Sequence, residues 1–245
     1  MRLKPLEITG LEFGRFSEIT PLNHRFIPGH PRLKLTVDLD LAARAPGATP
    51  ARFLALLGAL LPTLRRHTCC GHGRIEESFP GGASGSACAA AEPDDAVDVA
   101  HLLEHLIIDF QHGVADMRSC SGVTCGLRTP ITRYDLFIET PDEQVGRFSV
   151  MLACELMNHM LRGNEPSPSW TAALRLARRF FLAAADGLSG ARACGSPGGD
   201  EEDDDALRRL LAHGFVKEIP MAINYSGVPL YRFNAIEDNL IDKRS

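Results

Sequence analysis

The sequence lacks several features that would place it in a well-defined class. It has no apolar run approaching the roughly 20 residues that a membrane-spanning helix needs, and its first residues lack the apolar core of a signal peptide. It has no Cys-x-x-Cys pair, and its seven cysteines are scattered and odd in number, which argues against a disulfide framework. We therefore expect a cytoplasmic protein without a membrane partner.

The charge balance argues against general nucleic-acid binding. The formal net charge is −5, whereas general nucleic-acid binders are basic, so we expect no nucleic acid as a partner. The 245 residues are 44% hydrophobic and 23% charged, a composition typical of a globular protein with one large or two small domains. A homo-oligomer is compatible with this sequence.

Hydrophobic spacing predicts an α+β fold. Apolar and charged residues alternate where we expect strands, and apolar residues recur three and four apart where we expect helices. Thr49 and Pro50 begin one of the helices, which Pro62 should kink. In chain order we expect strands at 5–13 and 32–40, helices at 50–61 and 95–112, strands at 119–127 and 131–139, and a helix at 143–161. This order predicts an antiparallel or mixed sheet covered on one face by helices.

Composition changes divide the chain into four parts. We expect an α+β domain over 1–163, a helix packing on it within 164–190, an acidic flexible linker at 191–205, and a small helix-plus-hairpin extension at 206–245. A long flexible loop rich in Cys, Gly, Ser and Ala should cover 67–93. Its segment 67–72 (HTCCGH) has ligand types but no recognisable zinc-site spacing, so we expect no metal there.

The helix expected at 95–112 carries the sequence pattern H-x-x-E-H. His101 and His105 are four residues apart, so they project from the same side and can converge on one divalent metal ion. Glu104 lies close enough to act on a metal-bound water. The pattern is the inverted form of the H-E-x-x-H metallopeptidase motif, with two neutral His ligands and a Glu general base. The alternative is a polar patch without metal, but the surrounding Leu and Ile residues favour buried histidines that need partners.

The segment from Leu6 to about Gly163 resembles the N-terminal domain of bacterial cyanophycin synthetases. The pieces that carry the resemblance occur in this order: 37–44 (VDLDLAAR), 60–67 (LLPTLRRH), 101–105 (HLLEH) with Gln111 six residues later, 134–139 (YDLFIE) and 142–148 (DEQVGRF). The synthetases continue into an ATP-grasp domain and a Mur-ligase-like domain, which build a poly-aspartate backbone carrying arginine side chains. This sequence has no Gly-x-x-x-x-Gly-Lys-Ser/Thr phosphate loop, and the residues after Gly163 are too few for either ligase domain. Polymer synthesis is therefore not expected.

The resemblance implies a site and a chemistry. In that family the N-terminal domain binds the polymer, and in some members it also cuts the polymer at a metal-dependent site built on the H-x-x-E-H helix. Carried over residue by residue, His101 and His105 would be ligands of a metal, with Zn²⁺ the expected ion, and Glu104 the general base.

The third metal ligand has three candidates, because catalytic zinc usually takes three protein ligands and a water. Glu155 is favoured, since a carboxylate on a mostly apolar helix side needs a cationic partner. Cys125 is an alternative, because S-ribosylhomocysteine lyase, another H-x-x-E-H protein, uses a Cys from a comparable place. Glu143 is the other alternative, since it lies in the stretch that matches the family.

Arginines would bind the substrate. The sequence has one Arg fewer than the Gly-Arg-Thr-Arg-like stretch expected from the family, but Arg128, Arg133 and Arg147 remain and could hold acidic groups bidentately. We expect Arg128 and Arg147 to bind substrate and Arg133 to form a surface salt bridge.

Two functions follow from these patterns. The first is a metal-dependent hydrolase that cleaves a peptide or isopeptide in a peptide-like or polymeric amino-acid substrate such as a cyanophycin-like polymer. The alternative is a non-catalytic module, related to the cyanophycin synthetase N-terminal domain, that binds a polymer or a partner ligase. The intact Glu104 favours the hydrolase, since a binding module does not need a general base.

Overall fold

The chain folds as two units. The computed structural model describes residues 4–69, 73–75, 95–115, 117, 120–185, 201–212, 216–223 and 229–233. The first unit comprises Met1–Asp109 and Ser119–Pro166, and the second comprises Phe110–Arg118 and Ser167–Ser245. The expected boundary at residue 163 thus lies near the observed one, but the end of the H-x-x-E-H helix belongs to the second unit.

A four-stranded antiparallel sheet forms the centre of the first unit. Its strands are β1 (Leu6–Gly14), β2 (Arg32–Leu39), β5 (Gly122–Gly126) and β6 (Arg133–Glu139), and their order across the sheet is β1-β2-β6-β5. The expected α+β class is confirmed, and the sheet is antiparallel rather than mixed.

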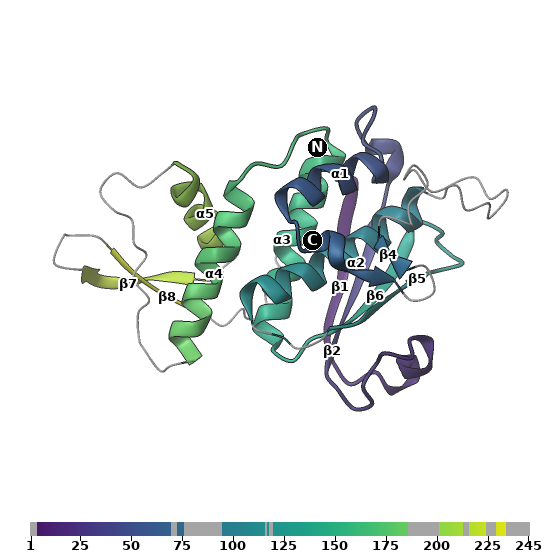
Figure 1. Ribbon diagram of the computed structural model, residues 1–245, viewed down its shortest axis with the longest axis horizontal. Coiled ribbons are helices and arrows are strands. Elements are labelled where there is room, and N and C mark those ends of the chain that lie inside the picture. Colours follow the sequence, from purple (N-terminus) through teal and green to yellow (C-terminus); the bar gives the residue numbers. More distant parts are fainter. Residues whose placement is uncertain are drawn as a thin grey trace. The chain divides into compact units, whose positions relative to one another are not determined.

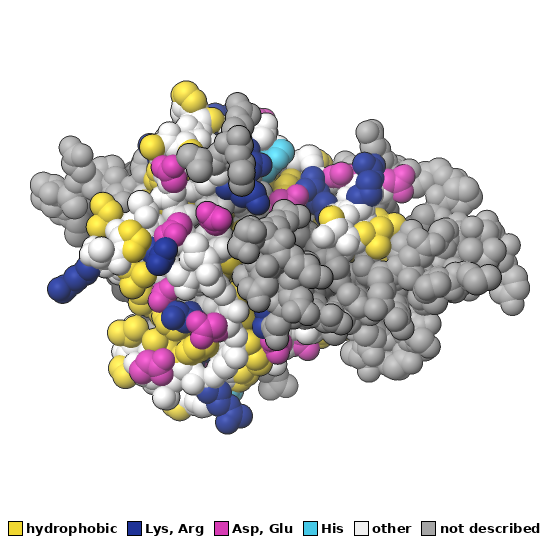
Figure 2. Space-filling view, turned by 180° about the vertical axis from the view of Figure 1, so that it is seen from behind, with side chains coloured by type: hydrophobic (Ala, Val, Ile, Leu, Met, Phe, Trp, Pro, Cys, Tyr) yellow, Lys and Arg dark blue, Asp and Glu magenta, His cyan; other side chains and the backbone are white. Residues whose placement is uncertain are grey.

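The alternation along β2 decides which face of the sheet is buried. Its apolar residues Leu33, Leu35 and Val37 are fully buried, as their period of two predicts. Its charged residues point to the other face, where Lys34 lies 3.5 Å from Asp135. Seen from behind, acidic and basic side chains are interspersed over the described surface of this unit (Figure 2), in keeping with such cross-strand pairing.

Three helices lie on the buried face of the sheet (Figure 1). They are α1 (Pro50–Leu60), α2 (Asp95–Val114) and α3 (Glu143–Leu161). Local signals explain where α1 and α3 begin. Thr49 caps α1, which has Pro at its first helical position, and the Asp142 side chain accepts a hydrogen bond from Val145 N at the start of α3. Pro62 does not kink α1 as expected, because the helix has already ended at Leu60.

The segment expected as a long loop contains a short ladder. β3 (Thr68–Cys69) pairs with β4 (Gly73–Arg74), which sequence periodicity cannot show in strands of two residues. Residues 70–72 and 76–93 of this expected loop lie outside the described residues.

The second unit contains α4 (Ser169–Ala185), α5 (Glu201–Ala212), β7 (Val216–Ile223) and β8 (Pro229–Phe233). The expected acidic linker at 191–205 is wrong in its last part, because residues 201–205 form the first turn of α5. Acidic side chains complement the positive end of a helix, and the carboxylate of Asp205 lies 3.1 Å from the Arg209 guanidinium one turn later. Residues 186–200 lie outside the described residues.

No helix among the described residues is long and apolar enough to cross a membrane.

Candidate metal centre

The H-x-x-E-H motif lies on α2, as the sequence predicts. The apolar side of this helix is fully buried, including Leu102, Leu103, Leu106 and Ile107. This packing fixes the rotation of α2, since a helix with one buried apolar stripe has one favourable orientation on a sheet. The polar residues of the motif are therefore held in place by the hydrophobic residues between them.

The two histidines of the motif face each other through the same ring nitrogen. His101 Nε2 lies 3.2 Å from His105 Nε2. Two nitrogen ligands of a tetrahedral zinc ion, each at the usual distance of about 2.0–2.1 Å, lie about 3.3 Å apart. The spacing of the pair therefore fits two ligands of one zinc ion.

His105 is held as a neutral imidazole. It is 5% exposed, and this burial lowers the pKa of His105 well below its ordinary value, with further lowering by His101 and then His67. A metal-ligating histidine must present a nitrogen lone pair, which the neutral ring has and the imidazolium lacks. The environment of His105 therefore favours the state that a ligand requires.

Glu104 is buried against β5. Its side chain is 5% exposed in the folded protein, and Thr124 Oγ1 donates a hydrogen bond to Oε2 across 2.5 Å. Burial raises the pKa of Glu104 to about 7, although the hydrogen bond from Thr124 lowers it. A carboxylate with a pKa near 7 can both accept and return a proton at neutral pH, which general acid–base catalysis requires.

Gly122 provides the space that Glu104 occupies. A Cβ atom at residue 122 would lie 2.6 Å from Glu104 Oε1, so a larger residue would displace the carboxylate. Gly122 and Thr124 share one face of β5 because side chains alternate along a strand. This face is the one directed toward α2.

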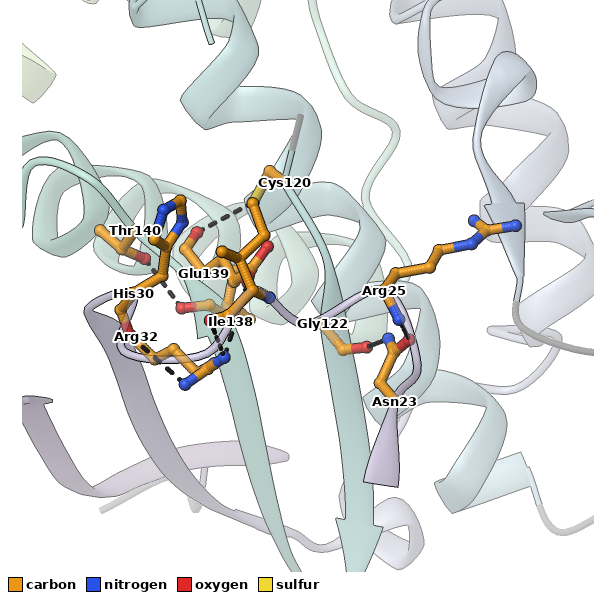
Figure 3. Close-up of polar contacts among 10 residues, drawn as sticks. Asn23, Arg25, His30, Arg32, Cys120, Gly122, Ile138, Glu139 and Thr140 are labelled. Carbon is orange, nitrogen blue, oxygen red and sulfur yellow. Dashed lines mark hydrogen bonds and ion pairs between the residues drawn. The ribbon is translucent and has the colours of Figure 1, made fainter. Parts of the chain in front are cut away.

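The loop before β2 holds the far side of β5. Asn23 Nδ2 donates to Gly122 O across 2.7 Å, and Asn23 Oδ1 accepts from Arg25 N (Figure 3). β5 is an edge strand, so the bond from Asn23 Nδ2 to Gly122 O satisfies a backbone group that the sheet leaves unpaired. This bond also ties the loop to the strand that contacts Glu104.

A buried ion pair anchors the other end of the same loop. Arg32 lies 3.6 Å from Glu139 Oε1, donates to Ile27 O, and stacks over Phe26 at 4.4 Å. Cys120 Sγ donates to the backbone oxygen of Glu139 (Figure 3). Each charged group is thereby paired, as buried charges require, and the segment entering β5 is fixed to the end of β6.

Two further polar residues lie beside the histidines. His67, which follows α1, has its Nδ1 3.4 Å from His105 Nδ1, and its Nε2 lies 3.1 Å from Asp109 Oδ1. Asp109 is one turn beyond His105 on α2 and is 4% exposed. The cluster thus extends from His101 through His105 and His67 to Asp109.

The structure separates the three candidates for the third ligand. Glu143 forms an ion pair with Arg147, 2.8 Å away. Cys125 packs with Phe137 on the sheet face opposite to Thr124, and Glu155 is half-buried on α3. Among the described residues, no group of three or more His, Cys, Asp and Glu side chains is arranged to hold a metal ion.

The arginines occupy different environments. Arg133 pairs with Asp38 through two contacts of 3.0 and 2.9 Å, the salt bridge expected for it. Arg147 is buried and donates to Glu143, so it stabilises the first turns of α3. Arg128 is exposed in the connection between β5 and β6.

Sequence reasoning missed His67, Asp109 and Thr124 as parts of the site. Asp109 had a signal, since it continues the four-residue spacing of His101 and His105 along one helix side. His67 lies in a segment that we expected to bind no metal. The role of Thr124 depends on the strand pairing, which the sequence does not show.

No protein-family model matches the sequence, and no curated protein matches it either.

Proposed function

We propose that the protein is a metal-dependent hydrolase that cleaves a peptide or isopeptide bond. The 3.2 Å spacing between His101 Nε2 and His105 Nε2 is the observation that carries this proposal. The pair supplies two nitrogen ligands on one helix side, which suits Zn²⁺. The buried Glu104 directly before His105 gives the site an acid–base group.

Glu104, Thr124 and Gly122 have separate roles in this reaction. When bound, a zinc ion polarises the scissile carbonyl and lowers the pKa of its water. Glu104 removes a proton from the attacking water and transfers it to the leaving amine. Thr124 Oγ1 donates a hydrogen bond to Glu104 Oε2. Oε1 is therefore the Glu104 oxygen that accepts and releases the transferred proton. Gly122 keeps the space around Oε1 free of a side chain.

The substrate class rests on the resemblance. We propose a cyanophycin-like polymer or one of its fragments, in which an isopeptide bond joins each arginine to the poly-aspartate backbone. Of the two arginines expected to bind substrate, we assign this role to the exposed Arg128, since the Arg147 guanidinium already pairs with Glu143.

A non-catalytic binding module is the competing function. It is favoured by the observation that the described residues supply no third protein ligand for the two histidines. Such a module would use His101 and His105 as structural residues and bind the polymer without cleaving it.

Metal content and cleavage separate the two functions. Elemental mass spectrometry of the purified protein should find about one zinc per chain, lost in a His101→Ala/His105→Ala variant and kept in His159→Ala. His159 is the matched control, because it lies on α3 with its Nε2 against Glu165 O. Cleavage of cyanophycin and of aspartyl-arginine isopeptides should require Glu104. Polymer binding without metal and without cleavage would show the binding module instead.

A further inference from the structure

Arg25 is exposed on the loop that connects the 3-10 helix Ser17–Leu22 with β2. Its Nη1 atom donates to Thr68 Oγ1 across 2.8 Å and to Thr68 O across 3.3 Å. Thr68 directly follows His67, whose Nδ1 lies 3.4 Å from His105 Nδ1. The Arg25 guanidinium is therefore held beside the segment that contacts a histidine of the motif.

The backbone of Arg25 is tied to the Glu104 side of the same centre. Arg25 N donates to Asn23 Oδ1, and Asn23 Nδ2 donates to Gly122 O. A Cβ atom at Gly122 would lie 2.6 Å from Glu104 Oε1, so this strand residue adjoins the candidate general base. In Figure 3 the Arg25 side chain extends away from both Asn23 and Gly122. Arg25 thus reaches from the Glu104 side of the centre to Thr68.

The loop does not depend on the Arg25 side chain for its position. Ile27 N donates to Glu139 Oε1 across 2.8 Å, and Ile27 O accepts from Arg32 Nη2 across 2.9 Å. Between them and Asn23, the side chain of Phe26 is buried. These contacts hold the loop, so the bond to Thr68 serves to orient the guanidinium.

The Arg25 guanidinium keeps donors for a ligand. Its Nε and Nη2 atoms carry further N–H groups, which have no acceptor among the residues that the structure describes. Arg133 and Arg147, by contrast, are paired with Asp38 and Glu143. An arginine stays charged at every pH that the protein meets, and its planar fork matches a carboxylate with two hydrogen bonds.

We propose that Arg25 binds a carboxylate of the substrate at the edge of the metal centre, and so selects substrates with a free carboxyl group. The inference rests on the proposed hydrolase function and adds a specificity-determining residue to it. A cationic group beside a cleft attracts anionic ligands. The bond to Thr68 orients the guanidinium before the ligand arrives, which lowers the ordering cost of binding.

Two forms of an aspartyl-arginine isopeptide test this role, one with both α-carboxyl groups free and one with both converted to amides. Calorimetry in a Glu104→Gln background measures their binding without cleavage. Adding Arg25→Ala should weaken binding of the free acid about tenfold, the effect of losing a hydrogen bond to a charged group. It should leave binding of the diamide unchanged, whereas a merely structural role would weaken both equally.

Further variants in the same background provide the controls. Arg25→Lys keeps the charge but not the fork, so it should retain part of the preference for the free acid. Thr68→Val removes the hydroxyl that orients Nη1 and should lower this preference less than Arg25→Ala does. Arg175→Ala is the matched control, because Arg175 Nη1 also donates to a threonine hydroxyl, Thr171 Oγ1, on α4 of the second unit. It should bind both probes as Glu104→Gln alone does.

The two proposals fail in different ways. If the Glu104→Gln protein binds neither probe, or if Arg25→Ala changes the binding of both probes equally or not at all, Arg25 does not bind the carboxylate, whatever the wild-type protein cleaves. A preference for the free acid that depends on Arg25, without cleavage of any isopeptide by the wild-type protein, would support the role of Arg25 and overturn the hydrolase.

Discussion

Thr124 Oγ1 donates a hydrogen bond to Glu104 Oε2 across 2.5 Å, so a strand residue holds the carboxylate that the motif helix presents. β5 is aligned by its pairing with β6, in which Thr124 lies opposite Leu136. The position of the candidate general base is therefore set by the sheet as well as by α2. This relationship makes Glu104 testable through a residue outside the motif.

Thr124→Val removes the donor and keeps the shape of the side chain. Because the hydrogen bond lowers the pKa of Glu104, the variant should need a higher pH to ionise Glu104. The acidic limb of the pH–rate profile should move to higher pH, and kcat at pH 7 should fall about tenfold, the effect of losing a hydrogen bond to a charged group.

Thr124→Ser is the matched control for this prediction. Serine keeps the hydroxyl, so its pH–rate profile should follow that of the parent. A valine variant whose profile overlays the parent's would mean that ionisation of Glu104 does not limit the reaction.

Gly122→Ala should damage the site, while Gly126→Ala should not. Both glycines lie on the same face of β5, but a Cβ at residue 122 meets Glu104 Oε1 at 2.6 Å, whereas at residue 126 it meets Tyr134 at an ordinary 3.4 Å. Gly122→Ala should cost about 1–3 kcal/mol of stability through overpacking and abolish most hydrolysis. Gly126→Ala should stay within about 0.5 kcal/mol of the parent. Urea unfolding and cleavage assays would check both, and equal behaviour of the two variants would contradict the contact with Glu104.

Patterns that are local along the chain could be predicted from the sequence. The alternation of apolar and charged residues in β2 predicted its buried face, and the cap Thr49 predicted the start of α1. The same reasoning assigned 201–205 to a linker, because an acidic run indicates disorder and helix N-terminus alike. Burial of the residues that follow distinguishes a helix from a disordered linker: α5 continues into Ala206 and Leu210, which are fully buried.

Contacts between distant segments could not be predicted in this way. His67 and His105 are 38 residues apart, and their meeting depends on how α1 and α2 lie on the sheet. For Cys125, the sequence placed a ligand type near the motif in the chain. The alternation of β5 directs its side chain to the opposite face of the sheet from Thr124, which only the strand pairing shows.

The metal-free protein should become less stable relative to its Glu104→Gln variant as pH rises from about 4.5 to about 7. Burial raises the pKa of Glu104 to about 7 in the folded state, whereas an unfolded glutamate has a pKa of about 4.3. Between these values the folded state binds the extra proton, so the free energy of unfolding falls with rising pH. The glutamine variant has no titrating group at position 104, so its free energy of unfolding lacks this pH dependence.

Urea unfolding of both proteins in chelator, at several pH values, would measure that difference. Because the other titrating groups are common to both proteins, their effects largely cancel in the comparison. A constant difference across this range would mean that Glu104 is not buried as a free carboxyl in the metal-free protein.

Glu155→Gln should leave zinc affinity close to that of the parent, because the described residues supply no third protein ligand for His101 and His105. Loss of a direct ligand should cost more than about 100-fold in affinity, since loss of an outer partner alone costs 10- to 100-fold. Glu143→Gln should have little effect on zinc, because Glu143 pairs with Arg147, and Cys125→Ser should have little effect because Cys125 packs with Phe137. Competition with a chromogenic chelator would rank the three. A loss of more than about 100-fold in Glu155→Gln would instead make this carboxylate the third ligand.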